Sequence, residues 1–271
     1  MRAPAPAKIN LALVVGPLRD DGKHELVTVY QRVGLADRID VDPAASFRVD
    51  GFLADTLVRG ALEALAARAG VEPAWRVRIE KRLPVAAGIG GGSSDAAAAL
   101  RLANETLAEP LPPEALHELA AALGSDVPFF LADGPQLGSG DGTELAPLDL
   151  PQDFWIVLVL PRDERKPSTR DVYAAFDRRD GAAGWEERRA ALLAALERVQ
   201  RPRDLAALPP NDLASSPLAG ELLGLGAFRA DVTGAGPAVY GLFHHEAAAK
   251  AAQHALKRVG RAWLTAPAWY G

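Results

Sequence analysis

The chain has 271 residues, of which 49% are hydrophobic, and this is enough to build two domains with a sizeable core. It contains no cysteine, which excludes disulfide scaffolds, thiol catalysis and cysteine-ligated zinc. The net charge is −5 and the basic residues are scattered, so nucleic acid is not an expected partner. The apolar run Ile9–Val15 is too short to cross a membrane, and Lys8 and Asn10 interrupt its entrance. We therefore expect a cytoplasmic protein without a signal peptide or a membrane partner.

The first half of the chain alternates strand and helix patterns. The Thr56–Ala69 segment, for example, places apolar residues at helical spacing, whereas Trp75–Ile79 alternates as a strand does. The predicted strands are Ile9–Val15, Val27–Val33, Arg38–Val41 and Trp75–Ile79, and the predicted helices are Thr56–Ala69, Ser94–Ala108 and Pro112–Leu123.

A domain boundary is predicted near the middle, where Pro147 and Pro151 precede the strand Phe154–Leu160. The boundary gives an N-terminal domain of residues 1–150 and a C-terminal domain of residues 151–271. Further helices are predicted at Thr169–Phe176, Gly184–Arg198 and Ala247–Val259, and further strands at Ala238–Phe243 and Trp263–Ala266.

The segment Pro84–Leu100, PVAAGIGGGSSDAAAAL, carries the clearest chemical signal. Its glycines let the backbone bend sharply and approach a ligand closely. Ser93 or Ser94 would cap the alanine-rich helix that follows, whose free N–H groups and dipole favour a phosphate. Asp95 would repel that phosphate, so it must point away or share a Mg²⁺ ion.

Three classes of phosphate loop compete for this segment. A Walker P-loop requires Gly-Lys-Ser/Thr, which occurs nowhere in the chain. The dinucleotide fingerprint GxGxxG fits only in part, because Ser93 stands at the third glycine and no acidic residue follows at the required distance. The third class is the Pro-x-x-x-Gly-x-x-Ser-Ser loop, which binds ATP phosphates without a P-loop lysine.

Phosphoryl transfer to a hydroxyl also needs a group that takes or orients the hydroxyl proton. Asp126 lies in a predicted turn between a helix and an apolar run, where an aspartate more often caps a helix. Lys8 opens an apolar strand, where a lysine more often marks a solvated strand end. As a pair the two make chemical sense, because a nearby ammonium keeps a carboxylate ionised.

The chain resembles the GHMP kinases over nearly its whole length, and six segments carry the resemblance. They are PAKINLAL (Pro6–Leu13), DGKHELVT (Asp21–Thr28), PVAAGIGGGSSDAA (Pro84–Ala97), GSDVPFF (Gly124–Phe130), PSTRDVY (Pro167–Tyr173) and TGAGPAVYGLF (Thr233–Phe243). The resemblance implies an α+β fold with two domains, an N-terminal ribosomal-S5-like α/β domain and a C-terminal ferredoxin-like α/β domain. It places the site in the cleft between them.

The resemblance also implies ATP and Mg²⁺, with the metal ligands left unassigned. Lys8 and Asp126 match the catalytic pair of the family, and Asp126 would act as the base. The residues that the resemblance assigns to ATP are Pro84, Gly88, Gly90, Gly91, Gly92, Ser93, Ser94 and, at the adenosine end, Lys81.

The acceptor that the resemblance implies is a small molecule, a polyol linked to cytidine diphosphate and phosphorylated on its 2-hydroxyl. Asn10 would contact the polyol, His24 the edge of the cytosine and Tyr173 its face, with Thr169 nearby. Lys23 stands where the family usually has a tyrosine, so Tyr30 is a candidate for the second stacking face. The expected assembly is a monomer or a weak homodimer.

Two other interpretations remain open at this stage. The chain could be another GHMP kinase, of the homoserine, mevalonate or sugar type, in which His24 and Tyr173 would not line a nucleobase pocket. It could also be a non-catalytic member of the fold that binds a small ligand, although such a protein would need neither Lys8 nor Asp126.

Overall fold

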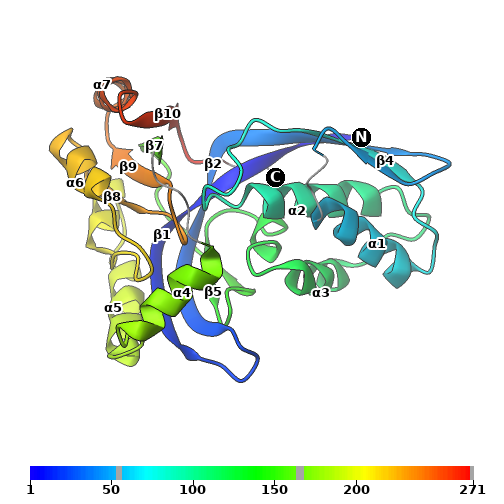
Figure 1. The fold of residues 1–271 in the computed structure, drawn as a ribbon, viewed down its shortest axis with the longest axis horizontal. Coiled ribbons are helices and arrows are strands. Elements are labelled where there is room, and N and C mark those ends of the chain that lie inside the picture. The colour runs from blue at the N-terminus through cyan, green and yellow to red at the C-terminus, as the bar shows by residue number, and fades with distance from the viewer. Residues whose placement is uncertain (53–56, 163–167, 269–271) are drawn as a thin grey trace. The chain divides into compact units, whose positions relative to one another are not determined.

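The computed structural model describes residues 1–52, 57–162 and 168–268, and Figure 1 shows its secondary structure. The chain divides into two compact units. Unit 1 comprises the segments Met1–Ala7, Leu35–Val85 and Gly90–Asp133, and unit 2 comprises Lys8–Gly34, Ala86–Ile89 and the chain from Gly134 onward. The domain boundary predicted between residues 150 and 151 is a division by sequence and stays a prediction.

Two long strands, β1 (Arg2–Leu18) and β2 (His24–Pro43), contribute residues to both units. In unit 1, β4 (Trp75–Glu80) pairs antiparallel with the second half of β2 and parallel with β3 (Arg48–Asp50). The side chains of β4 alternate between buried and exposed, as expected for a strand with one face against a core.

The helices of unit 1 form one packed group, consisting of α1 (Leu57–Ala69), α2 (Gly91–Asn104) and α3 (Pro113–Leu123) (Figure 1). The helix α2 is rich in alanine and almost entirely buried, and small side chains let neighbouring elements approach it closely. A short 3₁₀ helix, η1 (Pro128–Phe130), follows α3 and packs on α2.

The hairpin of β5 (Gln136–Ser139) and β6 (Glu144–Pro147) belongs to unit 2, and its strand β5 pairs with β2 at Thr28–Tyr30 in the sheet that also contains β1, β3 and β4. The second sheet is antiparallel with the strand order β10-β7-β9-β8. Its strands are β7 (Trp155–Pro161), β8 (Arg229–Val232), β9 (Val239–Phe243) and β10 (Gly260–Thr265).

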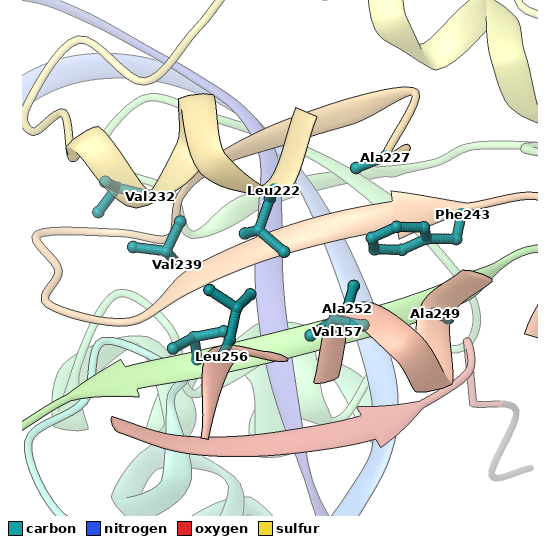
Figure 2. Packing of buried hydrophobic residues seen from close by; sticks show 10 residues of the cluster. Val157, Leu222, Ala227, Val232, Val239, Phe243, Ala249, Ala252 and Leu256 are labelled. Atoms are coloured by element: carbon teal, nitrogen blue, oxygen red, sulfur yellow. The ribbon is translucent and has the colours of Figure 1, made fainter. Parts of the chain in front are cut away.

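One face of the second sheet is covered by α6 (Pro217–Gly224) and α7 (Glu246–Leu256), and Figure 2 shows the core between them. Leu222 of α6 and Leu256 of α7 point toward valines of β7 and β9 in this core. On the opposite face, the buried Tyr240 hydroxyl donates to the Leu11 carbonyl of β1.

The remaining helices of unit 2 are α4 (Thr169–Arg178), α5 (Trp185–Leu196) and the 3₁₀ helix η2 (Pro202–Ala207). Ser168 and Asp171 form a capping box at the start of α4. Phe176 and Val172 on the buried side of α4 pack on Leu13 and Leu26, which attaches the helix to β1 and β2.

Mixed α and β structure was predicted correctly, but several boundaries differ. Val27–Val33 and Arg38–Val41 belong to one continuous strand, β2. The Ser94–Ala108 helix begins earlier, at Gly91, with Gly90 in the left-handed conformation (φ 71°) as its N-cap. Ser93 and Ser94 therefore lie inside the first turn and do not cap the helix. Thr56 and Pro167, the first residues of two of the segments named above, lie outside the described residues. None of the helices in the described parts is long and apolar enough to cross a membrane.

Candidate functional site

The phosphate-loop candidate begins α2 in unit 1. The backbone N–H of Ser94 donates to the Gly90 carbonyl, which closes the first turn of the helix. The Ser94 side chain is 1% exposed, and its hydroxyl makes no hydrogen bond to any described residue. Because an unsatisfied buried hydroxyl is costly, this group fits a phosphate or its metal ion, and the free N–H groups of the first turn fit a phosphate.

Lys81 lies beside the loop and is bound by two buried carboxylates. Its ammonium contacts Asp37 of β2 and lies 2.8 Å from Asp95 of α2. Asp37 also accepts the backbone N–H of Leu83 at 2.8 Å and that of Arg82, just before the loop. Burial lowers the pKa of the Lys81 ammonium, but the charge of Asp95 and hydrogen bonds to both carboxylates outweigh it and leave the pKa raised.

The environment of Asp95 is compatible with a phosphate at the loop. The side chain of Asp95 is fully buried and its charge is offset by Lys81, so a phosphate at the loop is not opposed by an uncompensated carboxylate. Asp37 was not identified from the sequence. Its partner Lys81 lies 44 residues away, and Asp37 itself lies between two segments that were predicted as separate strands.

The front of the loop belongs to unit 2, where it meets the turn Thr233–Pro237. Gly88 has a φ of +80°, and a Cβ there would lie 2.7 Å from the carbonyl oxygens of both Thr233 and Gly236. Only a glycine allows these two backbones to approach so closely. The Ala238 N–H donates to the Ala87 carbonyl at 3.2 Å and so joins the same two segments.

Lys8 lies beside this contact in a buried polar cluster of unit 2. Its side chain is 3% exposed, and its ammonium donates to Asn10 Oδ1 at 2.7 Å. The backbone N–H of Lys8 donates to the Ile89 carbonyl of the glycine loop, and a Cβ at Gly234 would lie 3.5 Å from Lys8 Nζ. Lys8 is therefore not a solvated strand end, because its charge is held inside the fold at the meeting point of two loops.

Asn10 connects Lys8 to two hydroxyl groups that the sequence did not single out. Its Oδ1 also accepts from the Thr233 hydroxyl at 3.2 Å, and its Nδ2 donates to Thr28 Oγ1 at 2.8 Å. Both threonines are fully buried. A polar residue within the apolar strand Leu26–Tyr30 was the one sequence signal for Thr28.

A second group of unit 2 surrounds His24 at the start of β2. The His24 ring stacks on Tyr173 of α4 with centroids 4.9 Å apart and meets the edge of Phe176 at 5.8 Å. His24 Nε2 lies 2.7 Å from Oδ1 of Asp177, which is one helical turn after Tyr173 on α4. The structure thus brings the two predicted base-binding residues together, whereas Thr169 is exposed at the first position of α4.

Tyr30 does not supply the second stacking face that the sequence suggested. Its side chain is 2% exposed, because Gly138 of β5 covers the ring and a Cβ there would lie 2.6 Å from it. The Lys8 ammonium lies 5.6 Å from the ring centroid of Tyr30. Lys23 forms an ion pair with Asp141 in the turn after β5.

Asp126 occupies a turn between α3 and η1 in unit 1, as predicted, and is partly exposed. The turn is closed by the Val127 N–H, which donates to the Gly124 carbonyl. Lys8 belongs to unit 2, so the pairing of Lys8 with Asp126 stays a prediction. No group of three or more metal-binding His, Asp or Glu side chains occurs among the residues with described positions.

Comparisons with known proteins agree on the family. The chain matches the family models for the GHMP kinases N terminal domain at residues 56–134 and for the GHMP kinases C terminal at residues 204–262. A protein of Anaeromyxobacter dehalogenans (strain 2CP-C) named 4-diphosphocytidyl-2-C-methyl-D-erythritol kinase is 41% identical, and the match covers 95% of this chain and 85% of the relative. A protein of the same name from Geobacter sulfurreducens is 36% identical, and the match covers 97% of this chain and 96% of the relative.

Solved structures give the same picture. A crystal structure of 4-(cytidine 5'-diphospho)-2C-methyl-D-erythritol kinase superposes with a TM-score of 0.79 at 33% identity, and the match covers both chains completely. A crystal structure of mevalonate kinase superposes with a TM-score of 0.76 over 98% of this chain and 99% of its own, but at 12% identity, which is evidence for the fold alone.

We predict that Lys81→Met destabilises the protein by roughly 3–5 kcal/mol, because it leaves two buried carboxylates without a cation. Urea unfolding measures the loss. Lys23→Met is the matched control, since it breaks the half-exposed ion pair with Asp141, and it is expected to cost less than about 1 kcal/mol. Equal losses in the two variants would contradict the buried ion cluster.

We also predict that Gly88→Ala impairs both folding and the use of ATP. The new Cβ would collide with two carbonyl oxygens and displace the loop, so the KM for ATP should rise and stability should fall by at least about 2 kcal/mol. Gly70→Ala has a similar φ, +68°, but open space around the Cβ, and should cost only about 1 kcal/mol with an unchanged KM. A Gly88→Ala enzyme that matched Gly70→Ala in both measurements would argue against the contact.

Proposed function

Because the chain belongs to the GHMP kinases, we propose that it transfers the terminal phosphoryl group of ATP to the 2-hydroxyl of 4-diphosphocytidyl-2-C-methyl-D-erythritol. Such a reaction is a step of isoprenoid precursor synthesis by the non-mevalonate route. Relatives of that name at 36–41% identity over most of their length support the choice of substrate. The observation that carries the proposal is the contact of Gly88 with the turn at Thr233 and Gly236, beside the buried ammonium of Lys8.

The proposed transfer is a displacement at phosphorus. The 2-hydroxyl oxygen forms a bond to the terminal phosphorus, and the bond from that phosphorus to the bridging oxygen breaks, so that ADP leaves. Asp126 takes the hydroxyl proton, and Lys8 stabilises the negative charge on the attacking oxygen. Each role needs a charge at a fixed place, and the hydrogen bond from Lys8 to Asn10 provides this for the ammonium.

The glycine loop would hold the phosphates of ATP. The free N–H groups at the start of α2 and the Ser94 hydroxyl would bind phosphate oxygens, with Gly88 and Gly90 allowing close approach. Lys81 would act indirectly, because both neighbouring carboxylates already engage its ammonium. A Mg²⁺ ion bound with ATP would neutralise charge on the phosphates, and the Ser94 hydroxyl is the buried oxygen of the loop that could bind it.

The cytidine end of the substrate would lie at His24 and Tyr173. An aromatic ring offers a nucleobase a stacking surface, and the imidazole offers a hydrogen bond to the base edge. Thr169 lies one turn before Tyr173 on α4, and Asn10 would face the polyol. The ion pair of Lys23 with Asp141 stands where an aromatic ring would otherwise cover the second face, so recognition of cytosine would depend mainly on Tyr173.

We expect ADP release with the cytidylated substrate and not with mevalonate, homoserine or galactose. Asp126→Asn should lower kcat by about 10²–10⁴-fold, the range of a general base, while the KM for ATP changes little. Glu118→Gln, which removes a charge from the exposed side of α3, should leave kcat unchanged. Turnover of another alcohol would overturn the substrate, and full activity of Asp126→Asn would overturn the base.

Tyr173→Leu should raise the KM for the cytidylated substrate about 5- to 150-fold, because stacking on one base contributes about 1–3 kcal/mol. The KM for ATP should stay the same. Tyr173→Phe retains the ring and should remain within about threefold of the wild type in steady-state kinetics. If both variants bound the substrate equally well, Tyr173 would not be a stacking residue.

A further inference from the structure

The hydroxyl of Thr28 ends a chain of hydrogen bonds that starts at Lys8. Thr28 lies in β2, is fully buried and donates its hydroxyl hydrogen to the Ala12 carbonyl of β1 at 2.8 Å. The same oxygen accepts the Asn10 side-chain N–H at 2.8 Å. The strand around it is apolar, so a valine of the same shape would suit the position if packing alone mattered.

The donors and acceptors of this chain fix the orientation of the Asn10 amide. A hydroxyl has one hydrogen, and that of Thr28 is committed to Ala12, so toward Asn10 it acts only as an acceptor. The NH₂ group of Asn10 must therefore face Thr28, and its oxygen must face the opposite way. With the amide reversed, two acceptors would meet at Thr28 and two donors would meet at Lys8.

The oxygen of Asn10 is fully used in this orientation. It accepts from the Lys8 ammonium at 2.7 Å and from the Thr233 hydroxyl at 3.2 Å, which uses both lone pairs of a carbonyl oxygen. The Thr233 hydroxyl in turn accepts the backbone N–H of Asn10 at 3.1 Å. Asn10 thus binds Lys8 through its oxygen and retains one N–H for the substrate.

We propose that Thr28 is a positioning residue for phosphoryl transfer, acting through Asn10 to hold the Lys8 ammonium in place. The inference rests on the proposed function for the role of Lys8, but the hydrogen bonds that carry it do not depend on the substrate. Thr28 does not touch the reacting atoms. Its loss would free the Asn10 amide to rotate, and a misplaced ammonium stabilises the transition state less well.

Thr28→Val tests this role, because it keeps the shape of the side chain and removes the hydroxyl. We expect kcat to fall roughly tenfold or more, with the KM for ATP within about twofold of the wild type. Thr28→Ser keeps the hydroxyl and should retain kcat within about threefold. Equal losses in the two variants, or a change confined to KM, would overturn the proposal.

A double-mutant cycle separates action through Asn10 from a general loss of structure. In an Asn10→Ala background, Thr28→Val should lower kcat by less than about twofold, because the link to Lys8 is already broken. A full tenfold loss in that background would contradict the proposal. If Thr28→Val does not fold, Thr28→Cys replaces it, since a thiol is only a weak acceptor.

A measurement without turnover distinguishes failure of this inference from failure of the proposed function. In the wild type, the side-chain amide of Asn10 should give a pair of NMR resonances whose protons exchange slowly with solvent, because one N–H is buried against Thr28. Thr28→Ser should preserve this protection and Thr28→Val should abolish it. Unchanged protection in Thr28→Val would overturn the inference, whereas a wild type that phosphorylates another alcohol would overturn only the substrate.

Discussion

The candidate site depends on the hydrogen bond that the buried ammonium of Lys8 donates to Asn10. A charge that is almost fully removed from water must be satisfied by the protein, and Asn10 supplies an oxygen at 2.7 Å. That oxygen is fixed in turn by Thr233 and, through the other end of the amide, by Thr28. One charge in one strand is therefore linked through Asn10 to a polar residue of β2 and to another in the turn before β9.

The glycine loop is likewise held by buried charged groups. Asp37 binds Lys81 and the backbone just before the loop, and Lys81 binds Asp95 inside the helix that the loop begins. The three charged groups connect β2, the start of the loop just after β4, and α2. A loop held at both ends loses little conformational entropy when a nucleotide binds, which favours affinity.

Sequence patterns predicted the elements with strong periodicity and the residues with an unusual local context. The glycine loop was recognisable because four glycines and two serines within seven residues have few other uses, and Lys8 because it interrupts an apolar strand. The two halves of β2 were separated wrongly, since Asp37 resembles a turn residue until its partners in Lys81 and Leu83 are known. Thr28 was missed for the same reason, because its hydroxyl is explained by residues 16 and 18 positions away. The short strands β5 and β6 lack an apolar pattern, and Gly138 belongs there because the Tyr30 ring fills the space of a side chain.

The sharing of β1 and β2 by both units has a consequence for synthesis on the ribosome. Unit 1 needs no residue beyond Asp133, so all of its segments have been synthesised when about half of the chain has been made. Unit 2 contains residues from Lys8 onward, yet its second sheet is completed by β10, which ends at Thr265. The first half of β2 can pair with β1 and with β5 before then, but the apolar side of β1 and β2 that α4 and β9 cover stays exposed until those later elements have been made. The start of α2 can form while the chain is still growing, but the polar cluster around Lys8 is assembled only after Thr233 has been added.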